Sequence, residues 1–383
     1  MKHLLSGFYK FILILVVISS GCKKGKVSEV PAPSLKVDSV YSWVCNMQMD
    51  NGLLKSSEGG RYVSLYDNSL AALVFLVYGD FSRAEKIFDF FEARMESELL
   101  VFPGGFGQMR TSNGIPVENK PRRWLGDNAW LLIALNHYHH LARNNRYENL
   151  EIALADWILS LQDTDGGLWG GFHENGKRIS KIAEGNIDAF NAIAGYTDFH
   201  RKLLMHFAQV RWDKKEKVLI AWADNPEHRY ALDLHSWGYC VFEDFPENVL
   251  QNANRFLTAK KSTLTHHLIH GYCFDEDRDV VWFEGTGQMA IAFIKAKKEK
   301  EAQFYLSSME KNMIHSKLFP STCGLPYVSN FGSSYGNDPL WEGADTNIAL
   351  SSTAWYLFGK LRFDPLGLGY EKNIPEDDKF WLK

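Results

Sequence analysis

Acidic residues that each lead into an apolar stretch recur along the chain and are the first candidates for chemistry. Each follows a short turn of glycine or polar residues and precedes small and apolar ones, as in Gly126-Asp127-Asn128-Ala129-Trp130. The six acids of this kind are Asp67, Asp127, Asp188, Asp233, Glu284 and Asp345. Carboxyl groups that meet in one place can act as an acid and a base, because burial or a neighbouring carboxylate raises the pKa of one of them. The pattern therefore indicates acid–base chemistry by carboxyl groups.

The spacing of these acids indicates a repeated architecture. Successive acids are 60, 61, 45, 51 and 61 residues apart, and such a period is a signal about the whole fold. Between them lie stretches with apolar residues at helical spacing and charged residues between. These amphipathic stretches are 37–47, 82–95, 147–161, 198–210, 246–257 and 298–309. The order of an amphipathic helix, a loop and a more apolar helix therefore occurs six times.

The apolar helices have the composition of helices that are buried on several faces. The stretches 129–135 and 349–358 are rich in small and aromatic residues, which suits an inner ring with the amphipathic helices outside it. Strand signals are weak, and only 218–222 and 280–283 are candidates for short extended pieces. We therefore predict an all-α protein, an (α/α)6 toroid of six inner and six outer helices in a single domain.

The two sharpest acid-led motifs resemble those of a known superfamily. Gly-Asp-Asn-Ala-Trp at 126–130 and Trp-Glu-Gly-Ala-Asp-Thr-Asn at 341–347 are similar to the inner helices of the six-hairpin glycosidases. The resemblance spans roughly 37–361 and is one of pattern, since no single family matches motif by motif. One mannan-cleaving family of this class has two adjacent aspartates near its second inner helix, where this chain has Gly126-Asp127. The resemblance implies a toroid that acts on carbohydrate, most directly as a glycoside hydrolase.

Two of the acids are the best candidates for catalysis. Glycoside hydrolysis requires two carboxyl groups, one as acid and the other as base or nucleophile. We expect Asp127 and Glu284 to be this pair, because inner helices two and five face each other across the ring and tryptophans flank both acids. For any one acid, capping of the free N–H groups at the helix start is an equally good explanation. Asp67 and Asp233 are interpreted as caps or as substrate contacts.

Further acids and tryptophans are expected to bind the substrate. Glu184 and Asp188 are four residues apart, and Glu342 and Asp345 are three apart. Such spacings place two carboxylates on one helix face, which suits sugar hydroxyls better than a calcium ion, since the loops lack a regular alternation of ligands. Tryptophan rings suit the apolar faces of sugars. The expected substrate-binding residues are Asp67, Trp130, Glu184, Asp188, Trp282, Trp341, Glu342 and Asp345.

The N-terminus has the pattern of an export signal. Lys2 and Lys10 accompany an apolar stretch at 11–18, which is followed by Ser19-Ser20-Gly21-Cys22. This resembles a bacterial lipoprotein signal, in which the cysteine becomes the lipidated first residue, although Ser19 stands where an aliphatic residue is usual. The apolar stretch is short for a transmembrane helix. An ordinary cleaved secretory signal is the alternative.

These features predict three segments. Residues 1–22 are expected to be the signal peptide, 23–36 a flexible tether and 37–383 the toroid domain. A lipid on Cys22 attaches the protein to the cell envelope, on the periplasmic side or at the outer surface, and is its only expected contact with a membrane.

The composition is that of a large globular protein. Of its 383 residues, 45% are hydrophobic and 14% aromatic, and the net charge of −4 gives no reason to expect nucleic-acid binding. His266 and His270 have the spacing of a zinc-binding helix but lack its glutamate, and the acidic turn at 275–279 is interpreted as solvated or as lining the mouth of the ring. We expect no metal and no cofactor, and an oligo- or polysaccharide as the partner.

Two alternatives of other kinds remain open. A polysaccharide lyase or a sugar epimerase on the same scaffold removes a proton next to a carbonyl or carboxylate, and His173, His235 and Tyr239 are the available groups. A non-catalytic glycan-binding lipoprotein needs the tryptophans but not two buried carboxyl groups. The fold by itself does not separate these functions.

Overall fold

The computed structural model describes residues 39–117, 122–222, 229–332, 334–335 and 338–383. They belong to the unit Val37–Lys383. The predicted signal peptide, Cys22 and the tether lie outside the described residues. Among the described helices, none combines the length and the apolar character that crossing a membrane requires.

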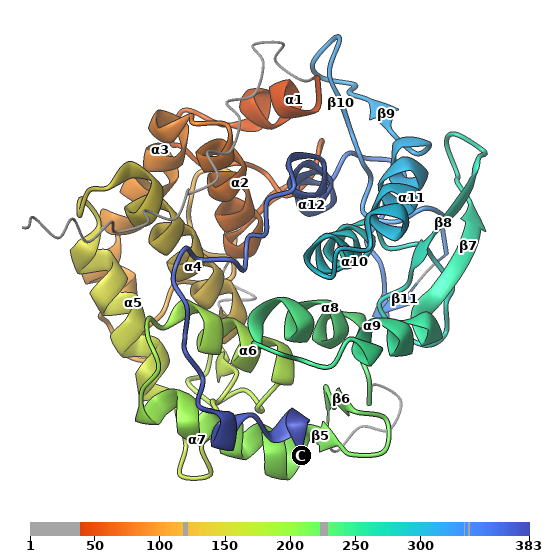
Figure 1. Cartoon of the computed structure of the whole chain (residues 1–383). Coiled ribbons are helices and arrows are strands. Elements are labelled where there is room, and N and C mark those ends of the chain that lie inside the picture. The colour runs from red at the N-terminus through yellow and green to blue at the C-terminus, as the bar shows by residue number, and fades with distance from the viewer. Residues whose placement is uncertain (1–38, 118–121, 223–228, 333, 336–337) are drawn as a thin grey trace, which may run out of the picture. The chain divides into compact units, whose positions relative to one another are not determined.

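Six helices of the described chain form an inner ring (Figure 1). They are α2 (Leu65–Val77), α4 (Leu125–Ala142), α6 (Ala183–Ala192), α8 (Leu232–Val241), α10 (Phe283–Lys295) and α12 (Leu350–Leu361). Each packs against the next, and α12 packs against α2, so the ring is closed. In α2, every residue from Leu65 to Leu76 except Tyr66 is buried. Small and aromatic residues on all faces are suited to such a helix, because no face is left for water.

Six outer helices cover this ring in the described chain. They are α1 (Ser39–Met47), α3 (Phe81–Glu92), α5 (Glu148–Ser160), α7 (Asp198–His206), α9 (Asn248–Asn252) and α11 (Glu299–Glu310). α1 packs against α12, and each of the others packs against the inner helix before it. In α3 the buried residues Ala84, Ile87 and Phe91 recur at helical spacing on one face. The predicted (α/α)6 toroid is therefore confirmed.

Short antiparallel ribbons connect some of the helices. β1 (Tyr62–Ser64) pairs with β2 (Met109–Thr111), β3 (Arg123–Trp124) with β4 (Gly171–Phe172), β5 (Trp212–Asp213) with β6 (Val218–Leu219), β7 (Leu257–Lys261) with β8 (Leu268–Tyr272), β9 (Ile314–His315) with β10 (Cys323–Gly324), and β11 (Ser334–Tyr335) with β12 (Asp338–Pro339). β1 leads directly into α2 and β3 into α4, so these two ribbons determine where those inner helices start.

The fifth helical hairpin departs from the prediction of a full outer helix. The stretch 246–257 forms only α9 and the short 3₁₀ turn η4 (Ala253–Phe256), and the chain continues into β7 and β8. β8 packs against α10 and α11, with Ile269 and Tyr272 buried. This ribbon therefore covers apolar surface that a longer outer helix covers elsewhere in the ring. His270 lies in β8, not in a helix.

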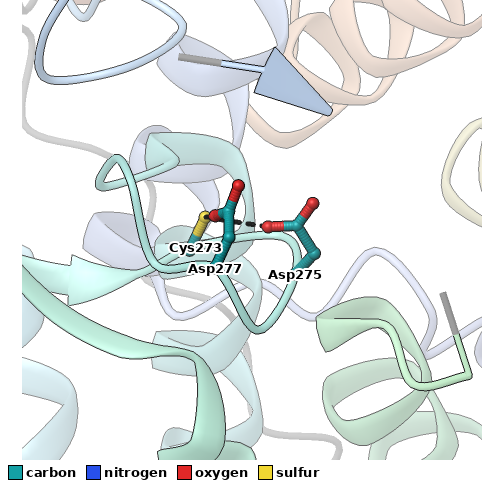
Figure 2. Close-up of side chains that lie close together, drawn as sticks. All are labelled: Cys273, Asp275 and Asp277. Carbon is teal, nitrogen blue, oxygen red and sulfur yellow. Dashed lines mark hydrogen bonds between the residues drawn. The ribbon is translucent and has the colours of Figure 1, made fainter. Parts of the chain in front are cut away.

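The acidic turn between β8 and α10 folds back on a cysteine (Figure 2). The Sγ atom of Cys273 contacts carboxylate oxygens of Asp275 at 3.5 Å and of Asp277 at 3.6 Å. A third contact, at 3.7 Å, is with Asp279. Asp275 is buried, so the expectation of a fully solvated turn is wrong at this residue.

The chain after α12 lies across the end of the ring where the inner helices finish (Figure 1). The Tyr370 hydroxyl donates to the carbonyl of Asn191 at 3.1 Å, and the Lys372 ammonium donates to the carbonyl of Ile193. Both carbonyls belong to the C-terminal end of α6. The tail therefore satisfies backbone acceptors that a helix end leaves free.

Candidate active site

A cavity of about 940 Å³ lies at the end of the ring where the inner helices begin. All six inner helices contribute residues to it. The described lining residues on these helices are Tyr66, Asp67, Gly126, Asp127, Trp130, Glu184, Gly185, Asp188, Asp233, Trp237, Glu284 and Ser351. The loops add further aromatic surface through Trp124, Phe274, Trp282, Tyr327 and Trp341.

Most residues predicted from the sequence line this cavity. They include the expected acid–base pair, Asp127 and Glu284. They also include the expected binding residues Asp67, Trp130, Glu184, Asp188, Trp282, Trp341 and Glu342. Trp341 is 49% exposed, and its ring centroid lies 4.5 Å from that of Tyr327. These two rings therefore border the open side of the cavity.

Asp345 does not line the described cavity, and the prediction that it shares a helix face with Glu342 is wrong. The described helix α12 begins only at Leu350 and has no acid in its first turn. Asp345 is buried in the turn before it, whereas Glu342 is exposed. Gly343 between them has a φ of 85°, which turns the chain and separates the two carboxyl groups. Ser351 is the lining residue of α12.

The inner helices start in register, and a buried polar residue at their fourth position sets this register. The Asn128 side chain accepts from the N–H of Phe106 at 2.8 Å, and it donates to the carbonyls of Phe106 at 3.1 Å and Trp124 at 2.9 Å. Asn68 makes the same contacts with Leu54 and Ser64, and Asn186 with Leu168 and Ile182. Each asparagine thereby joins the preceding loop to the start of its helix.

This register shows that the acids do not occupy one repeated position. Two acids, Asp67 and Asp127, stand one residue before the fourth position of their helix. Three others stand two residues before it, namely Glu184, Asp233 and Glu284. Asp188 stands two residues after it. Gly126 corresponds to Glu184 and Glu284. A Cβ atom at Gly126 would lie 2.9 Å from Asp188 Oδ2, so the glycine leaves room for that carboxyl group.

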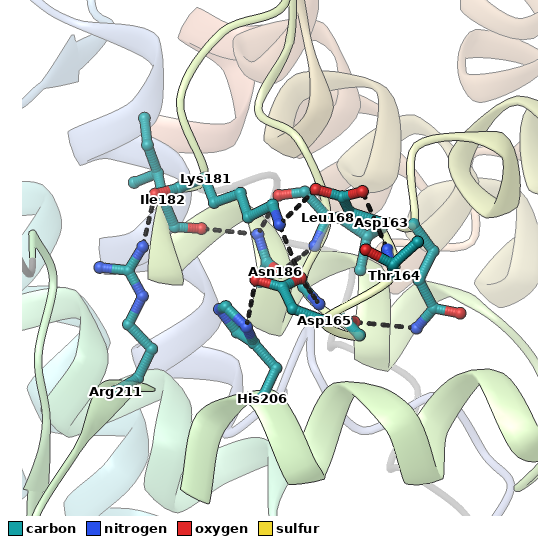
Figure 3. Close-up of polar contacts among 12 residues, drawn as sticks. Asp163, Thr164, Asp165, Leu168, Lys181, Ile182, Asn186, His206 and Arg211 are labelled. Carbon is teal, nitrogen blue, oxygen red and sulfur yellow. Dashed lines mark hydrogen bonds and ion pairs between the residues drawn. The ribbon is translucent and has the colours of Figure 1, made fainter. Parts of the chain in front are cut away.

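The start of α6 is held by a network of charged side chains (Figure 3). Lys181 donates to Asp163 at 2.7 Å and to Asp165 at 2.6 Å. Arg211 donates to the carbonyl of Lys181 at 2.7 Å, and His206 lies 3.3 Å from Asp165. These contacts connect three parts of the chain to the residues that precede Glu184. The three parts are the turn after α5, the end of α7, and the short π-helix Phe207–Arg211 that follows α7.

The cavity acids are held in surroundings that favour their protonated forms. Burial raises the pKa of four of them to about 7, namely Asp67, Asp127, Glu184 and Glu284. The charge of Asp67 adds to the rise in the pKa of Asp127 and of Glu284. Burial and then the neighbouring carboxylates raise the pKa of Asp188 and of Asp233 well above the usual value. Near neutral pH, some of these carboxyl groups are therefore protonated while others are ionised, which an acid–base pair requires.

The cavity is strongly acidic and contains polar atoms available to a ligand. Its described lining holds seven carboxyl groups and a single basic side chain, the exposed Arg61. Glu184 Oε2 and Asp188 Oδ1, and the indole nitrogens of Trp237 and Trp282, are buried without a hydrogen-bond partner among the described residues. Buried polar atoms without partners are unfavourable, so a ligand rich in hydroxyl groups suits this lining.

Two lining residues of importance, Tyr66 and Trp237, were not assigned to the site from the sequence, and a third, Asp233, was interpreted as a cap or as a substrate contact. Asp233 belongs to an acid-led segment and was recognisable, but capping explained it equally well. Tyr66 directly precedes Asp67, and Trp237 lies four residues after Asp233 on α8. Helical spacing from Asp233 was the signal available for Trp237, whereas Tyr66 had only its place at the start of an acid-led helix.

A second cluster has the composition of a metal site. Cys273, Asp275 and Asp277 hold ligand atoms within 4.8 Å of one another (Figure 2). This cluster does not belong to the described lining of the cavity. The described cysteines Cys45, Cys240, Cys273 and Cys323 are free thiols.

The fold is shared with enzymes of known structure. Neither a protein-family model nor a curated protein matches the chain. A glycosidase variant in complex with glucose superposes with a TM-score of 0.55 and 13% identity over 86% of this chain and 95% of that chain. A sugar epimerase from a ruminal bacterium gives 0.55 and 10% over 84% and 95%. An inactive alpha-1,6-mannanase variant of Salegentibacter sp. HEL1_6, in complex with alpha-1,6-mannotriose, gives 0.50 and 13% over 85% and 96%.

At such identities the likeness concerns the fold, and it extends over nearly the whole of each compared chain. Together with the closed ring of inner helices, it shows that this chain shares the (α/α)6 toroid fold of the compared structures.

Proposed function

We propose that the protein is a glycoside hydrolase that cleaves an uncharged oligo- or polysaccharide in the acidic cavity. The observation that carries this proposal is the convergence of buried carboxyl groups with raised pKa values beside tryptophan rings. Asp127 and Glu284 enter the cavity from α4 and α10, which are three places apart in the six-membered ring. They are the pair that we assign to acid and base.

The reaction needs one proton donor and one proton acceptor. One carboxyl group gives its proton to the glycosidic oxygen while the bond from this oxygen to the anomeric carbon breaks. Water forms the new bond to the anomeric carbon and gives a proton to the other carboxylate. Carboxyl groups on opposed helices leave room for this water, which favours inversion of configuration.

The charge of the cavity supports an uncharged substrate. Those of the carboxyl groups that are ionised repel uronic acid or sulfate groups, and in a partly buried cavity this repulsion is stronger than in water. Neutral sugars instead offer hydroxyl groups to the carboxylates and apolar faces to the tryptophans. The compared glycosidase and mannanase were solved with glucose and mannotriose, which are uncharged sugars.

Epimerisation is the second candidate, because one of the compared structures is a sugar epimerase. It requires a base that removes a carbon-bound proton, as does a lyase reaction. His173, His235 and Tyr239 are absent from the described lining. His235 is buried in α8, with Nδ1 2.9 Å from the carbonyl of Ala231. The groups present in the cavity therefore favour hydrolysis.

A panel of glycans tests the proposal, with protein that lacks residues 1–22. The panel contains glucans, mannans, a uronic acid polymer, and the same polymer after reduction of its carboxyl groups. We expect new reducing ends from an uncharged glycan without new ultraviolet absorbance. Ultraviolet absorbance would indicate a lyase, an isomerised sugar without cleavage an epimerase, and retention without reaction a glycan-binding protein.

We also propose that the protein is exported and held at the cell envelope by a lipid on Cys22. This proposal is supported by the order of charged, apolar and small residues before Cys22.

A further inference from the structure

Glu284 is held by a short chain of two hydrogen bonds, which runs from Trp355 through Tyr66 to Glu284. The Tyr66 hydroxyl lies 2.7 Å from Glu284 Oε1, and the indole nitrogen of Trp355 lies 3.0 Å from the same hydroxyl. An indole nitrogen can only donate, so the Tyr66 oxygen accepts from Trp355. The single proton of Tyr66 is then available to Glu284, and the contact has the geometry of a hydrogen bond from the Tyr66 hydroxyl to Oε1 of Glu284.

A second and longer hydrogen bond is also donated to Glu284. The amide nitrogen of Gln288 lies 3.5 Å from Glu284 Oε1, one turn along α10. The amide oxygen of Gln288 lies 3.3 Å from the Ser236 hydroxyl on α8, which fits an amide whose NH₂ group faces Glu284. Both Gln288 and Ser236 are buried, so water does not compete for these contacts.

Asp127 has no comparable support. Its side-chain donor is Gln108, at a long 3.4 Å, and the backbone N–H of Tyr66 also lowers its pKa. The like charge of Asp67 opposes both effects, as it also does at Glu284. Hydrogen bonds donated to a carboxylate favour its ionised form. The bond from Tyr66 to Glu284, at 2.7 Å, is shorter than the bond from Gln108 to Asp127, at 3.4 Å.

We propose that Tyr66, oriented by Trp355, is a positioning residue that keeps Glu284 ionised, so that Glu284 is the base and Asp127 the acid. This inference rests on the proposed hydrolase function and assigns the two roles within it. In the reaction, protonated Asp127 gives its proton to the glycosidic oxygen as the glycosidic bond breaks. The Glu284 carboxylate takes a proton from the water that bonds to the anomeric carbon.

The like charge near Glu284 favours its protonated form, so a hydrogen-bond donor such as Tyr66 is needed to keep it ionised. Asp67 from α2 acts on it as a like charge and favours its protonation, and the charge of Glu284 in turn raises the pKa of Asp233 from α8. From α12, the hydroxyl of Ser351 carries no charge and lowers the pKa of Glu284 through a hydrogen bond. Tyr66 is the closest donor that opposes this repulsion.

The pH dependence of kcat/KM in Tyr66→Phe tests the positioning role. Loss of the phenol raises the pKa of Glu284, and a base acts only when ionised, so the acidic limb of the profile is expected to move to higher pH by about one to two units. The alkaline limb, which reports the acid, is expected to stay. Tyr272→Phe is the matched control, because the buried Tyr272 hydroxyl bonds to Tyr305 outside the cavity.

Two amide variants test the assignment of roles independently. Asp127→Asn is expected to keep activity on an aryl glycoside whose leaving group needs no protonation, and Glu284→Gln to lose it. Added azide, which attacks without a base, is expected to restore Glu284→Gln only. The opposite pattern, or a Tyr66→Phe profile that moves only at its alkaline limb or not at all, overturns this inference. Failure of the unmodified protein to hydrolyse any glycan overturns the proposed function instead, and this inference with it.

Discussion

Asp127 and Glu284 are both buried acids at the starts of inner helices, but their partners differ. Glu284 accepts a short hydrogen bond from Tyr66 at 2.7 Å, whereas the side-chain donor to Asp127 is Gln108 at 3.4 Å. Two carboxyl groups whose surroundings differ in this way can divide the work of acid and base. At the scale of the residue, function therefore depends on neighbours that come from other helices.

Replacing either carboxyl group by its amide is expected to remove most of the activity. Asp127→Asn removes the proton donor and Glu284→Gln the acceptor, and a positioned acid or base contributes about 10²- to 10⁴-fold to the rate. Turnover of the preferred natural glycan and circular dichroism are the measurements. Asp345→Asn is the matched control, since Asp345 is buried but lies outside the described lining. Full activity in either of the first two variants contradicts the assignment.

Asp127 is expected to lower the stability of the fold at neutral and higher pH. Its pKa is about 7 in the folded chain, against 3.8 ordinarily, so the folded state holds a proton that the unfolded state releases above pH 4. Stability from this group therefore falls as the pH rises from about 4 to 7.

The Asp127→Asn variant measures this effect. Its Tm at pH 8 is expected to exceed that of the unmodified protein by about 2 °C or more, with little difference at pH 4. Scanning calorimetry at the two pH values provides the comparison. An equal rise at both values would show that the gain comes from packing and not from charge.

At the scale of the element, the buried asparagines are the main determinants of where the inner helices start. Asn68, Asn128 and Asn186 each satisfy the N–H and C=O groups of a loop residue and the carbonyl of the residue just before the helix. In α10, the Thr286 hydroxyl bonds to the N–H of Tyr272 and the carbonyl of Trp282. A shift of the start by one residue rotates the helix by about 100° and turns the acids away from the cavity.

Asn186→Ala is expected to destabilise the protein by about 2–4 kcal/mol, because it leaves the buried N–H and C=O of Leu168 unpaired. Chemical denaturation gives the free energy of unfolding. Asn136→Ala is the control: its side chain is half-buried and donates one bond, to the carbonyl of Ala192 at 2.8 Å, so a loss below about 1.5 kcal/mol is expected. Equal losses in both variants would mean that the contacts of Asn186 with the loop add nothing.

At the scale of the whole molecule, closure of the ring creates the cavity. The contact between α12 and α2 brings Trp355 to Tyr66 and, through it, to Glu284. Residues from the first, fifth and sixth inner helices thus form one hydrogen-bonded unit. The tail runs across the opposite end of the ring and bonds to the C-terminal end of α6.

The proposed lipid anchor also concerns the whole molecule. In a bacterial host, the full-length chain is expected to incorporate labelled palmitate and to sediment with membranes. Cys22→Ala is expected to lose the label, whereas Cys45→Ala, which changes a cysteine of the toroid, keeps it. A Cys22→Ala protein that is cleaved and released normally would instead support an ordinary secretory signal.

The sequence by itself determined the architecture and the end of the ring where the site lies. The alternation of amphipathic and apolar helices is a local property of the chain, because helical spacing and burial on one or several faces are written into consecutive residues. It predicted the toroid, and the acid-led starts of the helices indicated the cavity end. The ribbon of β7 and β8 was missed, since a short extended stretch depends on the surface that it covers.

Only the tertiary structure decided which acids share the cavity and in what state. The register of α12, set by packing and not by its acid, leaves Asp345 outside the described lining, while α8 brings Asp233 into it. The donor to Glu284 lies 218 residues earlier in the chain. The physical reason is that direction, burial and like-charge repulsion at a carboxyl group depend on atoms brought from distant helices, and local sequence carries no record of those neighbours.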